Sequence, residues 1–259
     1  MRDAVAVEAL KARRSRLPWV TAVAVAVAVI VASMFTFILQ DPDRARSLGL
    51  LGAKAQLAGG TADWPGYLSL LAQTTAVGGV GIFGVILIWI FGREFADRTA
   101  KDLLALPTAR TTIVSAKFAV SGVWCLMLSV ETYLLGLLAG AVLRLPGWSA
   151  SVASHGLGRL LFTTVMTWLL LSVLALAASV GRGYLPAVGV MFVLIFVSQV
   201  VAALGYGHLF PWSVPAIYSG LAGPDRTPPD PIGYTLVALV GSAGVLATLR
   251  WWRFADQSR

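Results

Sequence analysis

The sequence predicts an all-α integral membrane protein with six transmembrane helices. Of its 259 residues, 58% are hydrophobic and only 12% are charged, and the mean hydropathy is +0.80. A soluble domain carries about 25% charged residues. Six long apolar runs are present, each close to the roughly 20 residues that a helix needs to cross a bilayer. The composition therefore predicts a single transmembrane domain over residues 1–259 and excludes a soluble fold.

The six predicted spans follow one another with short polar connections between them. They cover about residues 17–39, 66–91, 113–143, 159–180, 184–204 and 232–249. A signal peptide is the alternative for the first run, because a basic segment precedes it. At about 23 residues, however, this run exceeds the apolar region of a signal peptide, which is roughly 7–15 residues long. We therefore expect it to remain as the first span.

The longest charged interruption, residues 89–117, lies between the second and third spans. It contains pairs of opposite charge four residues apart, as a helix surface favours, and an apolar stripe at helical spacing. The pairs are Glu94–Arg98, Asp97–Lys101 and Arg98–Asp102, and the stripe is Phe95, Thr99, Leu103 and Leu106. Pro107 ends the pattern because the residue before a proline avoids the helical region. We predict an amphipathic helix over residues 93–106 at the membrane surface, where a soluble partner can hold it.

The distribution of basic residues predicts the orientation. With both termini in the cytoplasm, 14 of the 20 Lys and Arg residues fall in inner segments and 6 in outer segments, as the positive-inside rule requires. This distribution also explains the net charge of +8 without nucleic acid as a partner. It places residues 93–106 and an N-terminal basic helix, residues 3–16, on the cytoplasmic side.

The motifs of several enzyme classes are absent from the sequence. None of the four lysines follows a glycine, so the chain lacks the phosphate-binding loop of nucleotide-binding proteins. The only histidines, His155 and His208, fall in outer segments, and the single cysteine, Cys125, lies within an apolar run. We therefore predict no metal site, no cofactor site and no catalytic site in this chain.

Polar residues inside the predicted spans are candidates for a substrate path. Glu131 lies near the middle of the third span, where a carboxylate is costly unless it is paired, protonated or exposed to water. It either fixes helix packing or belongs to a path for substrate or protons, together with Gln73, Thr74 and Thr75 of the second span. Other polar groups in the spans are Thr163, Thr164, Thr167 and Gln199. Between the fifth and sixth spans lies an outer re-entrant or interfacial segment whose aromatic residues include Trp212.

Three separated stretches share a pattern with a known family, in the same order along the chain. The charged segment reads Glu94-Phe95, Thr99, Leu103-Leu104, Pro107 and Arg110, followed by Ala116-Lys117. The other two stretches are VEALKARRSRLPW near the N-terminus and FPWSVPAIY before the last span. Together they resemble type-2 ABC exporter permeases, the family of bacitracin- and daunorubicin-type drug export permeases. Many members carry Gly directly before the Thr, where this chain has Arg98.

The resemblance implies a permease that works as a pair, as a homodimer or with a close paralogue, together with separately encoded ABC ATPase subunits that bind ATP and Mg. It implies export of an amphiphilic drug, a peptide or an envelope-related substrate. The helix at residues 93–106 would dock into the ATPase, with Glu94, Asp97, Arg98, Lys101 and Asp102 facing the ATPase or solvent and Phe95, Leu103 and Leu106 facing the spans. Thr99, Leu104, Pro107 and Arg110 complete the coupling candidates, and Glu8, Lys11, Arg13 and Arg14 are candidates in the N-terminal interface helix.

Two other classes remain open. An ion-coupled secondary transporter needs inverted repeats and several intramembrane charges, whereas the sequence offers only Glu131 deep in a span. A non-transporting membrane anchor or sensor subunit is the second alternative. Dependence of transport on ATP separates the first alternative from an ABC exporter, and the presence of transport separates the second.

Overall fold

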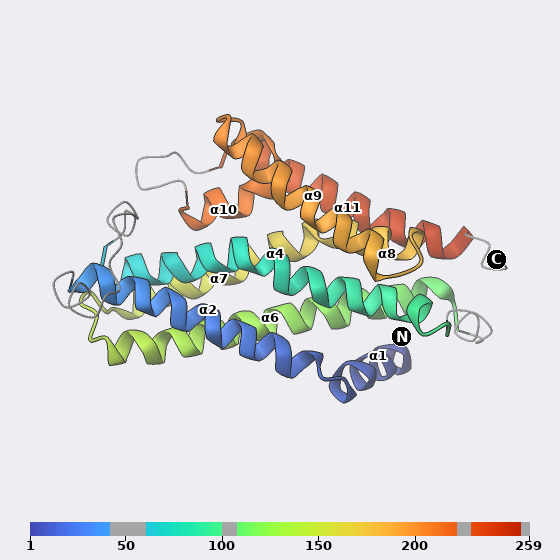
Figure 1. Cartoon of the computed structure of the whole chain (residues 1–259), viewed down its shortest axis with the longest axis horizontal. Helices are drawn as coiled ribbons and strands as arrows, with labels where there is room; N and C mark the ends of the chain where they lie inside the picture. The colour runs from blue at the N-terminus through green and yellow to red at the C-terminus, as the bar shows by residue number, and fades with distance from the viewer. Residues whose placement is uncertain (42–60, 100–107, 222–228, 255–259) are drawn as a thin grey trace.

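The computed structural model describes residues 1–41, 61–99, 108–221 and 229–254, and the regular secondary structure of these residues is entirely helical. Figure 1 shows the long helices running roughly along one direction, with both chain termini at the same end. We call this the termini end, and the opposite end the far end. The helices are α1 (Arg2–Arg14), α2 (Leu17–Gln40), α4 (Trp64–Ala96), α6 (Arg110–Val142), α7 (Ala150–Leu170), α8 (Ser172–Val180), α9 (Tyr184–Ala203), η2 (Gly207–Leu209), η3 (Pro211–Ser213), α10 (Val214–Ser219) and α11 (Pro231–Phe254).

The described residues contain six helical segments that are long and apolar enough to cross a membrane, which confirms the predicted number. They are α2, α4, α6, the pair α7 and α8, α9, and α11. The fourth segment begins at Ala150, earlier than the predicted residue 159. The reason is a helix cap, because the Ser149 hydroxyl accepts a hydrogen bond from the Val152 N–H at 3.1 Å. Asp63 caps α4 in the same way, accepting from the Gly66 N–H at 2.8 Å.

Helix α4 is the central element of the bundle. It packs against α2, α6, α7, α8, α9 and α10, and its side chains Ile86, Leu87 and Phe91 are completely buried. Helix α9 is its opposite, since it buries only Ala187 and Met191. Several of its large apolar residues, among them Leu185, Phe192 and Phe196, are exposed in the single chain, as expected for a helix at the lipid boundary.

Two glycines bring α4 and α9 close together toward the termini end. A Cβ atom on Gly84 would lie 2.7 Å from Met191 Sδ, and one on Gly92 would lie 2.6 Å from a ring carbon of Tyr184. Both distances are shorter than a carbon contact allows, so only glycine fits without movement of the neighbour. We call these two contacts the α4–α9 contact.

The segment between the last two spans folds back onto the bundle as η2, η3 and α10. These short helices pack against α4, α7, α9 and α11, and Gly220, with a φ of 96°, ends α10. Tyr218 of α10 stacks edge-on with Phe162 of α7, with ring centroids 5.1 Å apart. The segment therefore forms a folded cap beside α4 and α9.

The predicted surface helix at residues 93–106 differs from the structure at its start. Residues 93–96 are the last turn of α4, which runs unbroken from Trp64 to Ala96. A turn follows, in which Arg98 adopts a left-handed φ of 58°. The helix continues past the predicted end of the second span because Glu94 is neutralised by two lysines and Phe95 packs against tryptophans of α11. The rest of the predicted helix, residues 100–107, lies outside the described residues.

Candidate functional site

Four charged side chains from three helices meet at the termini end. They are Glu8 and Lys11 of α1, Glu94 of α4 and Lys117 of α6, and we call them the ion cluster. Lys117 is fully buried, Glu94 is 3% exposed and Glu8 is 6% exposed. Buried charges at this depth are tolerated only when they are paired and hydrogen-bonded. The partners of each side chain therefore decide what the cluster does.

Lys117 is completely saturated. Its Nζ donates to Glu8 Oε2 at 3.1 Å, to Glu94 Oε1 at 3.1 Å and to the backbone carbonyl of Ile90 at 3.0 Å. An ammonium group has three protons, so every donor of Lys117 has an acceptor. The three acceptors come from α1 and from the last two turns of α4, and Lys117 thereby ties α6 to both helices.

Lys11 closes the cluster from the other side. Its Nζ donates to Glu8 Oε1 and to Glu94 Oε1, both at 2.8 Å. Burial lowers the pKa of Lys11, but the hydrogen bonds to Glu8 and Glu94 and their negative charges together outweigh it, so the pKa lies above its ordinary value. The stabilisation from Lys11 is therefore fully present at neutral pH and is lost only as the pH rises through that raised pKa. With two carboxylates and two ammonium groups, the cluster is neutral.

Thr99 connects the cluster to the charged segment. Its hydroxyl donates to Glu94 Oε2 at 2.7 Å, leaving neither carboxylate oxygen of Glu94 without a donor. Thr99 is the last residue described before residues 100–107. The described chain next to that segment is therefore joined to Glu94 by the Thr99 hydroxyl as well as by the backbone.

The other face of the same α4 turn contacts the last span. The ring of Phe95 lies 5.7 Å from that of Trp252 and 6.0 Å from that of Trp251. Trp252 is fully buried, and its indole N–H donates to the Ser179 hydroxyl of α8 at 2.9 Å. The end of α4 is thus in rigid contact with α1, α6 and α11, and through Gly92 with α9.

The structure corrects the predicted orientation and pairing of Glu94. We expected Glu94 to face the ATPase or solvent and to pair with Arg98, whereas Glu94 is buried and paired with Lys11 and Lys117. The helical pair at this turn is instead Arg93 with Asp97, whose charged atoms lie 3.9 Å apart. The spacing rule failed because it considers only partners on the same helix.

The remaining coupling candidates divide into two groups. Asp97, Arg98, Arg13 and Arg14 are exposed at the termini end, and Arg110 is the half-buried first residue of α6. Lys101, Asp102, Leu103, Leu104 and Pro107 lie outside the described residues. Sequence reasoning missed Lys117 as a site residue. Its signal was a lone lysine followed by a long apolar run, where a buried cation requires an acidic partner.

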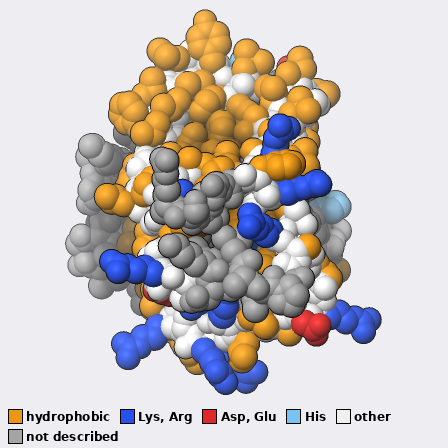
Figure 2. Space-filling model, turned by 90° about the vertical axis from the view of Figure 1, so that its right-hand side faces the viewer, with side chains coloured by type: hydrophobic (Ala, Val, Ile, Leu, Met, Phe, Trp, Pro, Cys, Tyr) orange, Lys and Arg blue, Asp and Glu red, His pale blue; other side chains and the backbone are white. Residues whose placement is uncertain are grey.

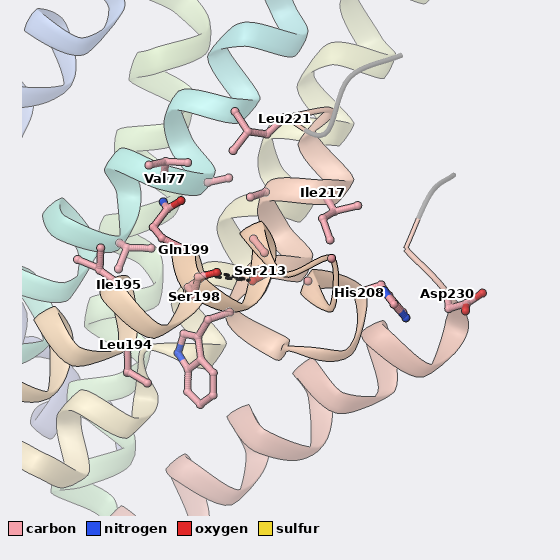
Figure 3. Close-up of a pocket in the computed structure, with 17 residues that line it drawn as sticks. Val77, Leu194, Ile195, Ser198, Gln199, His208, Ser213, Ile217, Leu221 and Asp230 are labelled. Carbon is pink, nitrogen blue, oxygen red and sulfur yellow. Dashed lines mark hydrogen bonds between the residues drawn. The ribbon is translucent and has the colours of Figure 1, made fainter. Parts of the chain in front are cut away.

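A second feature, an open cleft of about 680 Å³, lies between α4, α9 and the η2–α10 segment (Figure 3). Its walls are mostly apolar, and its polar side chains include Gln199, Ser198, Ser213 and Trp212. Figure 3 shows His208 and Asp230 together at one end of the cleft, away from Leu194 and Ile195. The lining from α4 consists of Ala76, Val77 and Val80.

The residues predicted to form a substrate path do not line this cleft. Glu131 is half-buried on α6. Gln73 donates to the Ser69 hydroxyl at 3.3 Å, and Thr74 and Thr75 donate to carbonyls one turn earlier in α4. All three side chains thus donate hydrogen bonds to groups of α4 itself. The part of α4 that lines the cleft begins one residue after Thr75, at Ala76.

Comparison with known proteins places these features in a family. The model of the ABC-2 family transporter proteins matches residues 4–198. The bacitracin transport permease protein BCRB of Bacillus licheniformis is 30% identical over 179 residues, which cover 69% of this chain and 85% of that protein. With six helices of transmembrane length, the chain is a multi-pass membrane protein. The extent of both matches shows that the chain belongs to the ABC-2 transporter family.

Proposed function

We propose that the chain is the permease subunit of an ATP-driven exporter, paired with a second permease copy or a close paralogue. A separately encoded ABC ATPase binds ATP and Mg and supplies the energy. The exported substrate is an amphiphilic drug, a peptide or an envelope-related compound. Membership of the ABC-2 transporter family and the similarity to a protein named as a bacitracin transport permease support this proposal.

The observation that carries the mechanism is the ion cluster beside the charged segment. On this proposal the ATPase holds residues 100–107, and its closure displaces Thr99 and the end of α4. Because Glu94 binds cations from both α1 and α6, the displacement moves three helices together. A saturated, buried cluster transmits such a movement, whereas solvated side chains would absorb it by rearranging.

The proposal puts the termini end in the cytoplasm, where ATP is. Figure 2 looks onto this end and shows Lys and Arg side chains around its edge, with few acidic side chains among them. Described basic residues here include Arg2, Arg13, Arg14, Arg16, Arg93, Arg98, Arg250 and Arg253. An excess of basic residues on the cytoplasmic side is the usual orientation signal of membrane proteins.

The test begins with purification of the tagged chain and its ATPase partner from the native membrane in mild detergent. ATP-dependent efflux, with bacitracin as the first substrate tried, is then compared between wild type and Glu94→Gln. We expect Glu94→Gln to lower efflux about tenfold while the complex still assembles, since coupling free energies are typically about 1–3 kcal/mol. Asp3→Asn, which removes an exposed carboxylate of α1 outside the ion cluster and outside the coupling candidates, is the matched control and keeps wild-type efflux.

The outcomes separate the alternatives. Efflux that needs no ATPase partner overturns the proposal in favour of a secondary transporter. A complex that forms and hydrolyses ATP but loses nothing with Glu94→Gln removes the ion cluster from the mechanism and leaves the exporter assignment in place.

A further inference from the structure

The cleft is closed on one side by the α4–α9 contact. Along α4 the cleft residues Ala76 to Val80 come first, and Gly84 and Gly92 follow toward the termini end. On α9 the order is mirrored, since Met191 packs on Gly84 while Leu194 and later residues line the cleft. The cleft therefore lies in the far half of the bundle, and the α4–α9 contact closes it on the side of the termini end.

Two polar side chains that line the cleft, Trp212 and Gln199, lack hydrogen-bond partners among the described residues. The indole N–H of Trp212 is buried and has no hydrogen-bond partner among the described residues. Gln199 is exposed in the open cleft, and its side-chain amide makes no hydrogen bond within the described part of the chain. The hydroxyls of Ser198 and Ser213 are hydrogen-bonded to each other at 3.1 Å. A buried N–H without an acceptor costs free energy that a bound acceptor restores.

The apolar wall lies beside these donors. Val77 of α4 and Leu194 and Ile195 of α9 line the same cavity as Gln199, and Figure 3 shows the Gln199 side chain beside Val77. The volume of about 680 Å³ falls within the range of small-molecule sites, roughly 300–1,000 Å³. A ligand that fills this space must present a hydrocarbon surface and, next to it, a hydrogen-bond acceptor.

We propose that the cleft binds an amphiphile in which an aliphatic body is joined to a carbonyl-bearing head, an acyl amide or an acyl ester. The body packs on Val77, Leu194 and Ile195, and the head accepts hydrogen bonds from Gln199 and Trp212. As a statement about transport substrate, this rests on the proposed function; as a statement about binding, it holds for the chain alone. Acyl peptides and acyl lipids share this chemistry.

The binding test uses photolabelling of the full chain in nanodiscs of a dialkyl ether phosphatidylcholine, which carries no acyl ester, without ATPase. The probes are a dodecanamide carrying a diazirine near its tail and the matching diazirine alkane without the amide. We expect the amide probe to label peptides from α9 and the η3–α10 segment, and to label them several-fold more than the alkane probe does.

Matched variants define the site. Ala202→Phe fills the cleft and should reduce labelling by the amide probe several-fold, whereas Ala203→Phe, at the next residue and outside the cleft, should leave it unchanged. Trp212→Phe keeps an aromatic ring but removes the N–H, and should abolish the preference for the amide probe while both probes still label.

Competition distinguishes the two sources of ligand. Protection by an unlabelled dodecanoyl tripeptide assigns the cleft to acyl peptides, and protection by added phosphatidylglycerol assigns it to acyl lipids. Equal labelling of the Ala202→Phe and Ala203→Phe variants, or equal labelling by the two probes in wild type, overturns the proposal. Neither result depends on ATP, so a failure here leaves the exporter assignment intact.

Discussion

The ion cluster and the cleft treat buried polar groups in opposite ways. In the ion cluster every proton of Lys117 and both carboxylate oxygens of Glu94 have partners from the chain itself. In the cleft the N–H of Trp212 has none among the described residues, and Gln199 lines open space. Both regions border α4. One helix therefore connects a cluster whose charged groups are all paired within the chain to a cleft with room for another molecule.

On the proposed function, this difference separates the region that transmits movement of the ATPase from the region that binds a ligand. A saturated cluster gains nothing from a ligand, but it holds α1, α4 and α6 in one arrangement. The cleft is mostly apolar, and the Trp212 N–H in its lining lacks an acceptor among the described residues. A molecule that supplies this acceptor and fills the apolar space would bind there favourably. Along α4, Gly84 and Gly92 of the α4–α9 contact lie between the cleft residues and the end of the helix that holds Glu94.

The largest effect should follow removal of the central cation. Lys117→Met leaves Glu8 and Glu94 buried with only Lys11 between them, and breaking a buried ion pair on one side typically costs about 3–5 kcal/mol. We expect that loss in the free energy of unfolding, measured by urea or thermal denaturation in one detergent. Arg13→Gln, which removes an exposed cation from α1, should change it by less than about 0.5 kcal/mol.

A double variant tests whether the charges act as a unit. Glu94→Gln combined with Lys117→Met removes one charge of each sign and should destabilise less than the sum of the two single changes. Strict additivity would mean that the two side chains act independently, and the contrast between a saturated cluster and an open cleft would then rest on the cleft alone.

Much of the bundle was predictable because membrane spans are specified locally. Each apolar run is long enough to form all its backbone hydrogen bonds within one helix, so composition and length indicated six spans. The departures arose at caps and charges. Ser149 extends the fourth segment toward the N-terminus by capping α7, and Glu94 allows α4 to continue where a charged residue suggested the end of the span.

The ion cluster was not predictable from spacing, since its pairs join residues far apart in the sequence. Glu8 and Lys117 are separated by 109 residues, and Glu94 and Lys117 by 23. In the sequence, Lys117 stands out only as part of a family pattern and as a basic residue on the inner side. The same holds for the cleft, because Gln199 and Trp212 meet only when the η2–α10 segment folds back onto α9.

The next prediction concerns the α4–α9 contact, which lies between the ion cluster and the cleft. Gly84→Leu should destabilise the protein by about 1–3 kcal/mol, as overpacking of a closed interface usually does, because Met191 and Leu174 occupy the space. A Cβ atom built on Gly81 of the same helix meets no atom within 4 Å, so Gly81→Leu should leave stability nearly unchanged. Gly84→Ala should fall between them, since the flexible Met191 side chain can shift. If both leucine variants unfold at the same temperature, the α4–α9 contact does not seal the cleft.

The smallest effect should come from the link between the cluster and the charged segment. Thr99→Val removes the hydroxyl that donates to Glu94 Oε2 at 2.7 Å and lies 3.5 Å from the Glu94 carbonyl oxygen. Because Thr99 is exposed, the loss should be near the usual net value of about 1 kcal/mol. We expect unfolding to change little and substrate-stimulated ATP hydrolysis to fall about fivefold, since the bond transmits movement more than it holds the fold. Thr99→Ser keeps a hydroxyl at the same position and should retain most of the stimulation. A Thr99→Ser variant as defective as Thr99→Val would show that the methyl group matters and the hydrogen bond does not, and the route from residues 100–107 into the ion cluster would have to run through the α4 backbone alone.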